Sequence, residues 1–571
     1  MNMKKKSVVI AILVLTTALA FGGGGSSGRS GAGTPSGPFQ RRDANVNEPG
    51  VLPVVKNQIA LSFGTGVNIQ VSDYDNNDLT KYFEKLTNIK LNFILYDPGA
   101  DGDTKFGLQV AAGDKLPDII MGLGIPNKAR RESYGQAGAL LPLNDYLDNL
   151  GYFTQKALEQ TTMAKNGMNP WVYGTDDNGV IWGYISYSTI SLNSYSGRAW
   201  YNSDFAQKLG MGEWTGGGNK GKIPTQEWFY NYLVGVRDND VNGNGDKNDE
   251  IPLIGGTGWR QQVLKWLTQQ YIYNDYSSTD NFWFIRNGQL YYSFNMPEYR
   301  EALRFINKLY RERLFEDTAI TQNGTTLYAT VNARPLKAGV VVANIADIDA
   351  EARQIYKAIP IVEGPDGFAT ATYFQEQPSF PWAISSNCLY PEAAFRWFDA
   401  MASDPDFPIY PRYGLKDRDW RVARSDEIGL FHPQSDVPPY VVQLVQTWGN
   451  AITSAHWKME FGIDYMNRKS SMTWNRDPTE FQYMNAQAVL GMIPFRPAEY
   501  PVGLIFTTAE NEQWAEIRTN VLNYANQCLA EFATGQLDVD RDWDTYIRNL
   551  RALGAEQLLT IDQAAYARMM N

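Results

Sequence analysis

The chain has 571 residues, 43% of them hydrophobic, and a formal net charge of -11, so it is long enough for more than one domain. The acidic excess and the absence of a long basic run argue against nucleic-acid binding. Two cysteines, Cys388 and Cys528, cannot form a disulfide framework, and two histidines, His432 and His456, leave little for a Ser-His-Asp triad or a His-rich metal centre.

The N-terminus has the pattern of an export signal. Lys4, Lys5 and Lys6 precede an apolar run over 8–21, which is shorter than the ~20 residues that span a bilayer. We therefore expect a signal peptide over 1–21, with Ala18 and Ala20 offering an A-x-A cleavage site, and a Gly/Ser-rich linker over 22–49. Bacterial lipoproteins carry a cysteine at the end of the apolar run, and none is present here, which leaves lipid anchoring open. No later stretch is comparably apolar, so no transmembrane helix is expected.

Residues 59–122 alternate between strand and helix patterns. Ile89, Leu91, Phe93 and Leu95 alternate with other residues as in a strand, and Asp78 is placed to cap the helix before it. Residues 104–112 predict a second helix, and 118–121 a buried strand. Strands alternating with helices predict a parallel α/β sheet.

Later segments predict more helix. Pro391 stands at a first helical position. Thr507 and Glu510 form a capping box, the apolar residues after them recur at helical spacing, and Gly535 ends the run. Cys528 falls on that apolar face and is therefore expected in a core.

An acidic loop over 238–250 follows a helix predicted to begin near Thr225. Counted from Asp238, the loop has the spacing of an EF-hand calcium loop, with Asp in place of the final Glu. Calcium takes six to eight oxygen ligands, and alternate short side chains in a tight turn can point them inward. The alternative is a solvated acidic loop. Because 251–254 is predicted to be extended, no second EF helix follows, and any calcium would be structural.

Several short motifs, in order along the chain, resemble those of extracellular solute-binding proteins of ABC importers. They are similar to the branch that includes alginate-binding and lipoprotein-type oligosaccharide binders. The matching stretches are Asn47–Gly50, Leu116–Ile120, Trp200–Tyr201 through Leu209–Gly210, Asn242–Gly245, Asp249–Pro252, Gly364–Gly367, Pro391–Ala394, Phe532–Gly535, Trp543–Tyr546, Leu553–Gly554 and Ala564–Tyr566. The acidic loop is one residue longer than the usual family loop. Alignment with the family implies Asp240, Asn242, Asn244, Asp249 and Glu250 as calcium ligands, whereas the EF-like count gives Asp238, Asp240, Asn242, Asp246 and Asp249. Both frames stay open.

The resemblance implies a fold of two α/β lobes of the type II periplasmic-binding class, with the second lobe rich in helix. A ligand cleft lies between the lobes, and hinge closure surrounds the ligand. The implied N-terminal lobe takes 50–190 and 345–405, and the C-terminal lobe takes 191–344 and 406–571.

The implied ligand is a carbohydrate, and the aromatic content agrees with it: 16 Trp, 33 Tyr and 26 Phe. Flat rings suit the C–H faces of sugars, although burial in a core is an equal expectation for each one. The candidate ligand-binding residues are Tyr187, Trp200, Trp259, Trp382, Trp448 and Trp457, with Asp73, Arg260 and Glu376 as polar partners.

The resemblance also implies the cellular role. The chain is expected to be an exported monomer at the cell surface or in the periplasm that delivers its ligand to importer permease subunits. It is not expected to be an enzyme. Two alternatives remain: a secreted glycoside-active enzyme, which needs two carboxylates ~5–9 Å apart, and a secreted carbohydrate-binding or adhesion protein without a transporter.

Overall fold

The structure is a computed structural model. It describes residues 43–165, 167–187, 194–212, 223–274, 282–374, 377–422, 424, 441–444, 452–465, 473–474, 481–500 and 503–570. The predicted signal peptide and most of the predicted linker lie outside these residues. Among the described residues, no helix is both long and apolar enough to cross a membrane.

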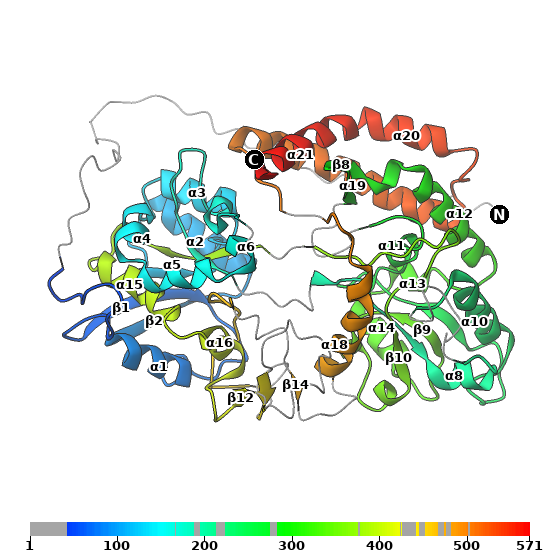
Figure 1. The fold of residues 1–571 in the computed structure, drawn as a ribbon, viewed down its shortest axis with the longest axis horizontal. Helices are drawn as coiled ribbons and strands as arrows, with labels where there is room; N and C mark the ends of the chain where they lie inside the picture. The colour runs from blue at the N-terminus through cyan, green and yellow to red at the C-terminus, as the bar shows by residue number, and fades with distance from the viewer. Residues whose placement is uncertain are drawn as a thin grey trace, which may run out of the picture. The chain divides into compact units, whose positions relative to one another are not determined.

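A five-stranded mixed sheet organises the first α/β group of elements (Figure 1). Its strand order is β2-β1-β3-β11-β4, built from β1 (Ile59–Gly66), β2 (Ile89–Tyr96), β3 (Ile119–Met121), β4 (Tyr184–Ser186) and β11 (Ser379–Ile384). β1, β2 and β3 are parallel, whereas β11 is antiparallel to both of its neighbours. The parallel strands predicted over 59–122 are thus present.

The helices of this group are α1 (Asp78–Thr87), α2 (Ala100–Ala112), α3 (Lys128–Gln136), α4 (Asn144–Leu150), α5 (Tyr152–Glu159), α6 (Thr162–Lys165), α15 (Pro391–Met401) and α16 (Tyr410–Tyr413). The helical turns η1 (Pro170–Tyr173) and η5 (Phe407–Ile409) complete it. The N-cap of α1 is Asn77 and not the predicted Asp78, because the Asn77 side chain accepts the Leu79 N–H. Pro391 begins α15 as predicted.

A four-stranded mixed sheet organises the second group. Its order is β10-β5-β9-β6, built from β5 (Ala199–Asn202), β6 (Ile251–Ile254), β9 (Ala338–Val342) and β10 (Tyr356–Ile359). β6 and β9 are parallel, and β5 is antiparallel to both β9 and β10. We call the elements on the five-stranded sheet the first lobe and those on the four-stranded sheet the second lobe.

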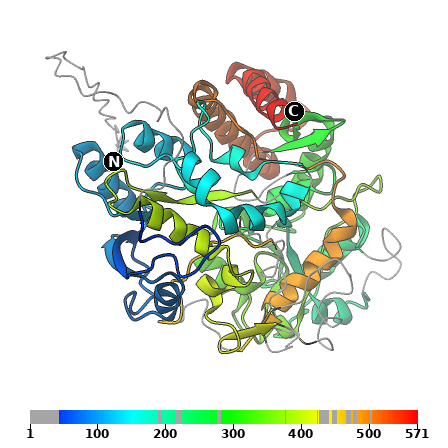
Figure 2. The same cartoon turned by 60° about the vertical axis from the view of Figure 1, so that its left-hand side comes forward.

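Helix dominates the second lobe. Its helices are α8 (Ser203–Lys208), α10 (Gln226–Asp238), α11 (Val263–Thr268), α12 (Pro297–Arg311), α13 (Thr318–Thr321), α14 (Gly324–Val331), α18 (Phe481–Met492), α19 (Thr508–Thr534), α20 (Trp543–Ala552) and α21 (Ala555–Met570). A hairpin of β7 (Trp283–Arg286) and β8 (Gln289–Tyr292) joins them, with the helical turns η2 (Ser293–Asn295), η3 (Ile345–Asp347), η4 (Ala352–Gln354) and η7 (Ile493–Phe495). Figure 2 shows α20 and α21 beside α19. Cys528 is buried in this core, as predicted.

The capping box at Thr507 and Glu510 and the left-handed Gly535 fix the ends of α19 as predicted. A small sheet of β12 (Trp420–Val422), β13 (Val441–Gln443) and β14 (Thr473–Trp474) lies apart from both main sheets.

Two segments do not follow the predicted lobe boundaries. β10 pairs with β5 in the second sheet, although 345–405 was expected in the first lobe. Residues 452–465 pack on the first lobe, although 406–571 was expected in the second: Thr453 bridges Val71, and the Trp457 ring lies 5.3 Å from that of Phe63. Backbone pairing and aromatic packing between distant segments decide these assignments, and neither has a local sequence pattern.

Candidate functional site

The carboxyl ends of the parallel strands lie on one edge of each sheet. In the first sheet, β1, β2, β3 and β4 end there, and β11 begins there. In the second, the pairing of Ala199 with both Val342 and Ile359 puts the ends of β9 and β10 beside the start of β5. Open α/β sheets bind ligands outside the carboxyl ends of their strands, because loops and unpaired backbone groups gather there.

The chain crosses between the sheets at these same two edges. It leaves the first sheet after Ser186 and enters β5 at Ala199, and it returns from Ile359 to β11 at Ser379. The two crossing segments also pair with each other, since Tyr195 forms an antiparallel bridge with Tyr373. The carboxyl edges of both sheets are therefore joined by two adjacent lengths of chain.

An aromatic cluster braces the crossing segments. The Tyr195 and Tyr373 rings lie 4.9 Å apart, and the Tyr373 and Tyr500 rings 4.7 Å apart. The Arg496 guanidinium lies 5.2 Å from the Tyr373 ring. Burial raises the pKa of Tyr195 to about 12. No sequence pattern predicts this cluster, because its members come from three separate segments of the chain.

A cavity of 390 Å³ opens at the carboxyl edge of the first sheet. Its polar groups include Asp97, Asp103 and Glu460, and Phe461, which is 1% exposed, lies behind them in the aromatic core. It is lined by Thr65, Gly66, Asp97, Gly99, Asp103, Met121, Gly122, Leu123, Pro381, Met459, Glu460 and Phe461. Arg412 forms an ion pair with Glu460, and Arg130 one with Asp103 at 3.2 Å. A few fixed polar groups beside apolar walls are typical of small-molecule sites.

The matching edge of the second sheet carries Trp259 on the loop after β6. Its indole is 50% exposed, whereas Arg260 is only 2% exposed. The Arg260 guanidinium lies 3.9 Å from the centre of the Trp259 ring, and Arg260 has a φ of 62°. Left-handed backbone at a non-glycine residue costs on the order of 1–3 kcal/mol and is found at functional sites.

The same loop is tied to η3. The side-chain amide of Gln261 donates to Asp347 at 3.0 Å, and its oxygen accepts the Gly258 N–H at 3.1 Å. Burial raises the pKa of Asp347, although the bond from Gln261 opposes the rise. The loop that presents Trp259 is therefore held at its base.

The other predicted ligand residues have mostly structural surroundings. Trp200, Trp382 and Trp457 are at most 1% exposed, and the Trp200 indole donates to the Ala343 carbonyl at 3.0 Å. Tyr187 is buried beside Ile463. The Asp73 carboxylate accepts both the backbone and side-chain N–H groups of Asn76, which lower its pKa. Trp448 and Glu376 lie outside the described residues.

The acidic loop after α10 folds around Asp240. The Asp240 carboxylate accepts the backbone N–H groups of Gly243, Asn244 and Gly245 at 2.8, 3.1 and 2.8 Å. Gly243 and Gly245 both have positive φ, which permits this tight turn. As predicted, a helix begins near Thr225, and 251–254 forms a strand, β6; the Thr225 side chain caps α10 by accepting the Trp228 N–H.

Asp249 and Glu250 close the other side of this loop. Asp249 accepts the side-chain amides of Asn242 and Asn244 and pairs with Lys337 at 2.8 Å. Burial raises the pKa of Glu250, and the charges of Asp249 and Asp240 add to the rise against opposing N–H bonds. The Glu250 Oε2 atom is buried and has no hydrogen-bond partner among the described residues.

Asp238 and Asp246 face other partners. Arg237 donates to both oxygens of Asp238 at 2.7 and 2.9 Å, and Asp246 accepts from Asn248. The residues that contact one another in this loop are the five calcium ligands implied by alignment with the family: Asp240, Asn242, Asn244, Asp249 and Glu250. Within the described part of the chain, no group of three or more His, Cys, Asp or Glu side chains is arranged to hold a metal.

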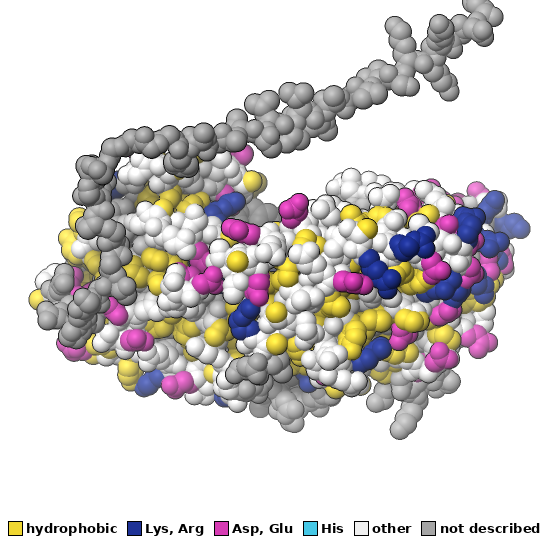
Figure 3. All heavy atoms as spheres, turned by 90° about the horizontal axis from the view of Figure 1, so that it is seen from above, with side chains coloured by type: hydrophobic (Ala, Val, Ile, Leu, Met, Phe, Trp, Pro, Cys, Tyr) yellow, Lys and Arg dark blue, Asp and Glu magenta, His cyan; other side chains and the backbone are white. Residues whose placement is uncertain are grey.

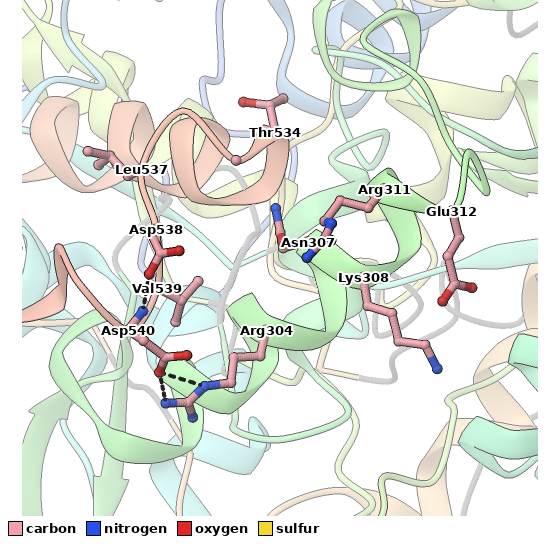
Figure 4. Close-up of a pocket in the computed structure, with 11 residues that line it drawn as sticks. Arg304, Asn307, Lys308, Arg311, Glu312, Thr534, Leu537, Asp538, Val539 and Asp540 are labelled. Carbon is pink, nitrogen blue, oxygen red and sulfur yellow. Dashed lines mark hydrogen bonds and ion pairs between the residues drawn. The ribbon is translucent and has the colours of Figure 1, made fainter.

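A larger groove of 790 Å³ lies between α12 and the connection from α19 to α20 (Figure 4). Arg304 and Asp540 in its wall pair with each other, and its lining includes no aromatic side chain. Figure 3 shows the Lys and Arg side chains gathered at this end of the molecule with Asp and Glu among them. This groove lies on neither carboxyl edge, and its charges are largely balanced.

Comparison with known proteins decides the family. The family described as bacterial extracellular solute-binding protein matches residues 69–406. The chain belongs to this family. The solute-binding fold of two α/β lobes is the architecture described above.

Among curated solute-binding proteins, the fructooligosaccharide ABC transporter substrate-binding protein FusA of Streptococcus pneumoniae is 22% identical over 510 residues, 85% of each chain. The structure of FusA in complex with kestose has a TM-score of 0.66 at 19% identity, covering 90% of this chain and 99% of FusA. An EF-hand mutant of FusA with fructo-nystose has a TM-score of 0.64 at the same identity and coverage. An HMO-binding solute-binding protein of Bifidobacterium longum infantis has a TM-score of 0.67 at 17% identity, covering 89% and 98%.

Proposed function

We propose that this solute-binding protein captures an oligosaccharide and delivers it to the permease subunits of an ABC importer. The observation that carries the proposal is the topology: two sheets present their carboxyl edges to the same pair of crossing segments. The named ligands of the similar proteins, kestose and fructo-nystose, support the choice of an oligosaccharide.

In this proposal, each lobe supplies one wall of the ligand site. The first wall is the cavity beside Phe461 and Glu460, and the second carries Trp259 and Arg260. An exposed indole backed by a guanidinium offers a flat, rigid face to a sugar ring, and the carboxylates accept its hydroxyl groups. The lobes close about the crossing segments when both walls contact the ligand. Asp73 is a less favoured candidate, because Asn76 occupies both of its oxygens.

We further propose that the loop over 240–250 binds one structural calcium ion. The EF-hand named in a FusA structure supports this, and so does the fit of the residues. Asp240, Asp249 and Glu250 supply hard carboxylate oxygens, and Asn242 and Asn244 supply amide oxygens. The buried Oε2 of Glu250 is an oxygen that a cation would satisfy. Calcium would draw these side chains together and neutralise their repulsion.

Transport and not catalysis is the proposed activity, and the family membership supports it. We propose that the protein is exported and acts as a monomer, with carbohydrate hydrolysis as the alternative to test. Purified protein incubated with kestose should yield no free monosaccharide by chromatography. Sugar release that persists after removal of contaminants would favour the enzyme.

Calorimetric titration tests the binding proposal. Kestose and fructo-nystose should bind with 1:1 stoichiometry, and fructose should bind more weakly because it reaches fewer of the proposed contacts. A folded protein that binds none of a broad panel of oligosaccharides would contradict the proposal. Co-purification with the permease subunits distinguishes an importer component from a secreted adhesion protein.

A further inference from the structure

A hydrogen bond connects the two lobes outside the two segments in which the chain crosses between the sheets. The Asp177 carboxylate, on the first lobe between η1 and β4, accepts the backbone N–H of Thr508 at 2.9 Å. Thr508 is the first residue of α19 in the second lobe. Both residues are exposed, so the contact lies at the surface.

The first-lobe side of this contact is rigidly built. Asp177 lies in a turn organised by its buried neighbour Asp176, whose carboxylate accepts the N–H groups of Asn178 and Val180 at 2.9 and 2.8 Å. The other oxygen of Asp176 accepts the Trp182 indole N–H at 2.9 Å. The turn thus presents the Asp177 carboxylate outward in a fixed position.

The second-lobe side is built independently. The first N–H groups of a helix have no partner within it, and the Thr508 N–H is one of these. The capping box uses the N–H groups of Thr507 and Glu510, and Arg568 from α21 holds Glu510 at 2.7 Å. The helix start is therefore ordered while the Thr508 N–H stays available to an outside acceptor.

The charges on both sides favour the contact. The hydrogen bonds from Thr508 lower the pKa of Asp177, and the positive charges of Lys128 and Arg568 lower it further. α19 is 27 residues long, and the positive end of a helix dipole attracts a carboxylate at its first turn.

We propose that Asp177 and the start of α19 form a latch that stabilises the closed arrangement of the lobes. Its partners are parts of different lobes, so the bond forms only when the lobes approach and is lost when they separate. Surface contacts of this kind shift an equilibrium by about two- to tenfold. Because no ligand atom takes part in this bond, the latch affects the fraction of closed molecules in the ligand-free protein. It rests on the proposed hinge closure but not on the identity of the ligand.

The chain offers a substitution that removes the donor and keeps the helix. Proline is favoured at the first position of a helix, where its missing N–H is not needed. Thr507 has φ -69° and ψ 162°, the extended conformation that the residue before a proline prefers. Thr508→Pro should therefore break the latch without disturbing α19, and Thr508→Ser, which keeps both the N–H and the hydroxyl that reach Asp177, is the matched control.

Single-molecule energy transfer on the ligand-free protein tests the latch. One dye is attached through Ala112→Cys on α2 and the other through Asn523→Cys on α19, both exposed positions, in a background of Cys388→Ser and Cys528→Ala. Asp177→Ala and Thr508→Pro should each lower the closed-to-open ratio by about two- to tenfold. Asn178→Ala, on the same turn, should behave as the unsubstituted protein.

The double variant decides whether the two residues act together. If they form one latch, Asp177→Ala should add little on the Thr508→Pro background. Unchanged energy transfer in either single variant, or additive effects in the double variant, would overturn the proposal. The proposed carbohydrate function would fail differently, because loss of sugar binding leaves these ligand-free distributions unaffected.

Discussion

The guanidinium carbon of Arg260 lies 3.9 Å from the centre of the Trp259 ring, at the carboxyl edge of the second sheet. One residue of this pair is buried and the other is half exposed. The buried cation therefore packs against the ring, and about half of the Trp259 surface stays open to a ligand.

Trp259→Ala should weaken oligosaccharide binding at least about tenfold, or ~1.4 kcal/mol, because the main exposed aromatic surface of this wall is lost. Arg260→Lys should weaken it less, since the charge remains but the planar stacking does not. Calorimetric titration with kestose measures both. Tyr390→Ala is the control: Tyr390 is also exposed, but it follows β11 at the opposite edge of the first sheet. Equal affinities for Trp259→Ala and Tyr390→Ala would remove Trp259 from the site.

Chelation of calcium should lower the melting temperature of the purified protein, because an ion that binds only the folded loop stabilises it by mass action. At calcium one hundred times above its dissociation constant, the loss is about 2.7 kcal/mol. Asp240→Ala should mimic chelation, whereas Asp238→Asn should not, since Asp238 pairs with Arg237 outside the group. Magnesium should substitute poorly.

Metal analysis gives an independent check on the same loop. The purified protein should contain calcium. If it contains none, and if chelator leaves its melting temperature unchanged, the loop is only a solvated acidic turn. If Asp238→Asn destabilises as much as Asp240→Ala, the ligand frame is instead the one counted from Asp238.

Local signals predicted local structure well. The capping box of α19, the proline at the start of α15 and the alternating residues of β2 are each set by neighbours within a few positions. The acidic loop could also be located from the sequence. Its two possible ligand sets share three residues and differ in the other two, and only the hydrogen-bond partners of the side chains distinguish them. The Arg237 bond to Asp238 is the observation that favours one frame.

The candidate ligand residues were harder to predict, because exposure depends on packing between distant segments. Trp382 and Trp457 have the same side chain as Trp259, yet both lie in an aromatic core with Phe63 and Phe461. Nothing adjacent to either tryptophan in the sequence marks it as buried. Glu460 could not be predicted either, since its segment returns to the first lobe without a strand or helix pattern.

Ligand should draw the two lobes together. Small-angle scattering of the protein saturated with a bound oligosaccharide should therefore give a smaller radius of gyration than that of the ligand-free protein. A non-binding sugar at the same concentration controls for solvent contrast. Identical profiles at a saturation confirmed by calorimetry would mean that binding occurs without hinge closure.

Asp562 should make the stability of the protein depend on pH between about 4 and 6. Its carboxylate is 4% exposed, accepts the Trp514 indole N–H at 2.7 Å and also accepts the Tyr292 hydroxyl. Burial raises its pKa to about 6, although these bonds and the charge of Arg518 oppose the rise. The folded state thus binds a proton more tightly than the unfolded state, so this contribution is complete below pH ~4 and is lost as pH rises through 6.

Asp562→Asn replaces the titratable carboxyl group with an amide and should therefore remove this dependence of stability on pH. The difference in unfolding free energy between the variant and the unsubstituted protein should shift in favour of the variant by up to about 3 kcal/mol from pH 4 to pH 7. Any fixed loss from exchanging a carboxyl for an amide is the same at each pH and cancels in that comparison. Denaturant unfolding at several pH values measures it, with Asp544→Asn on the exposed side of α20 as the matched control. A difference that stays constant across this range would show that Asp562 remains ionised in the fold.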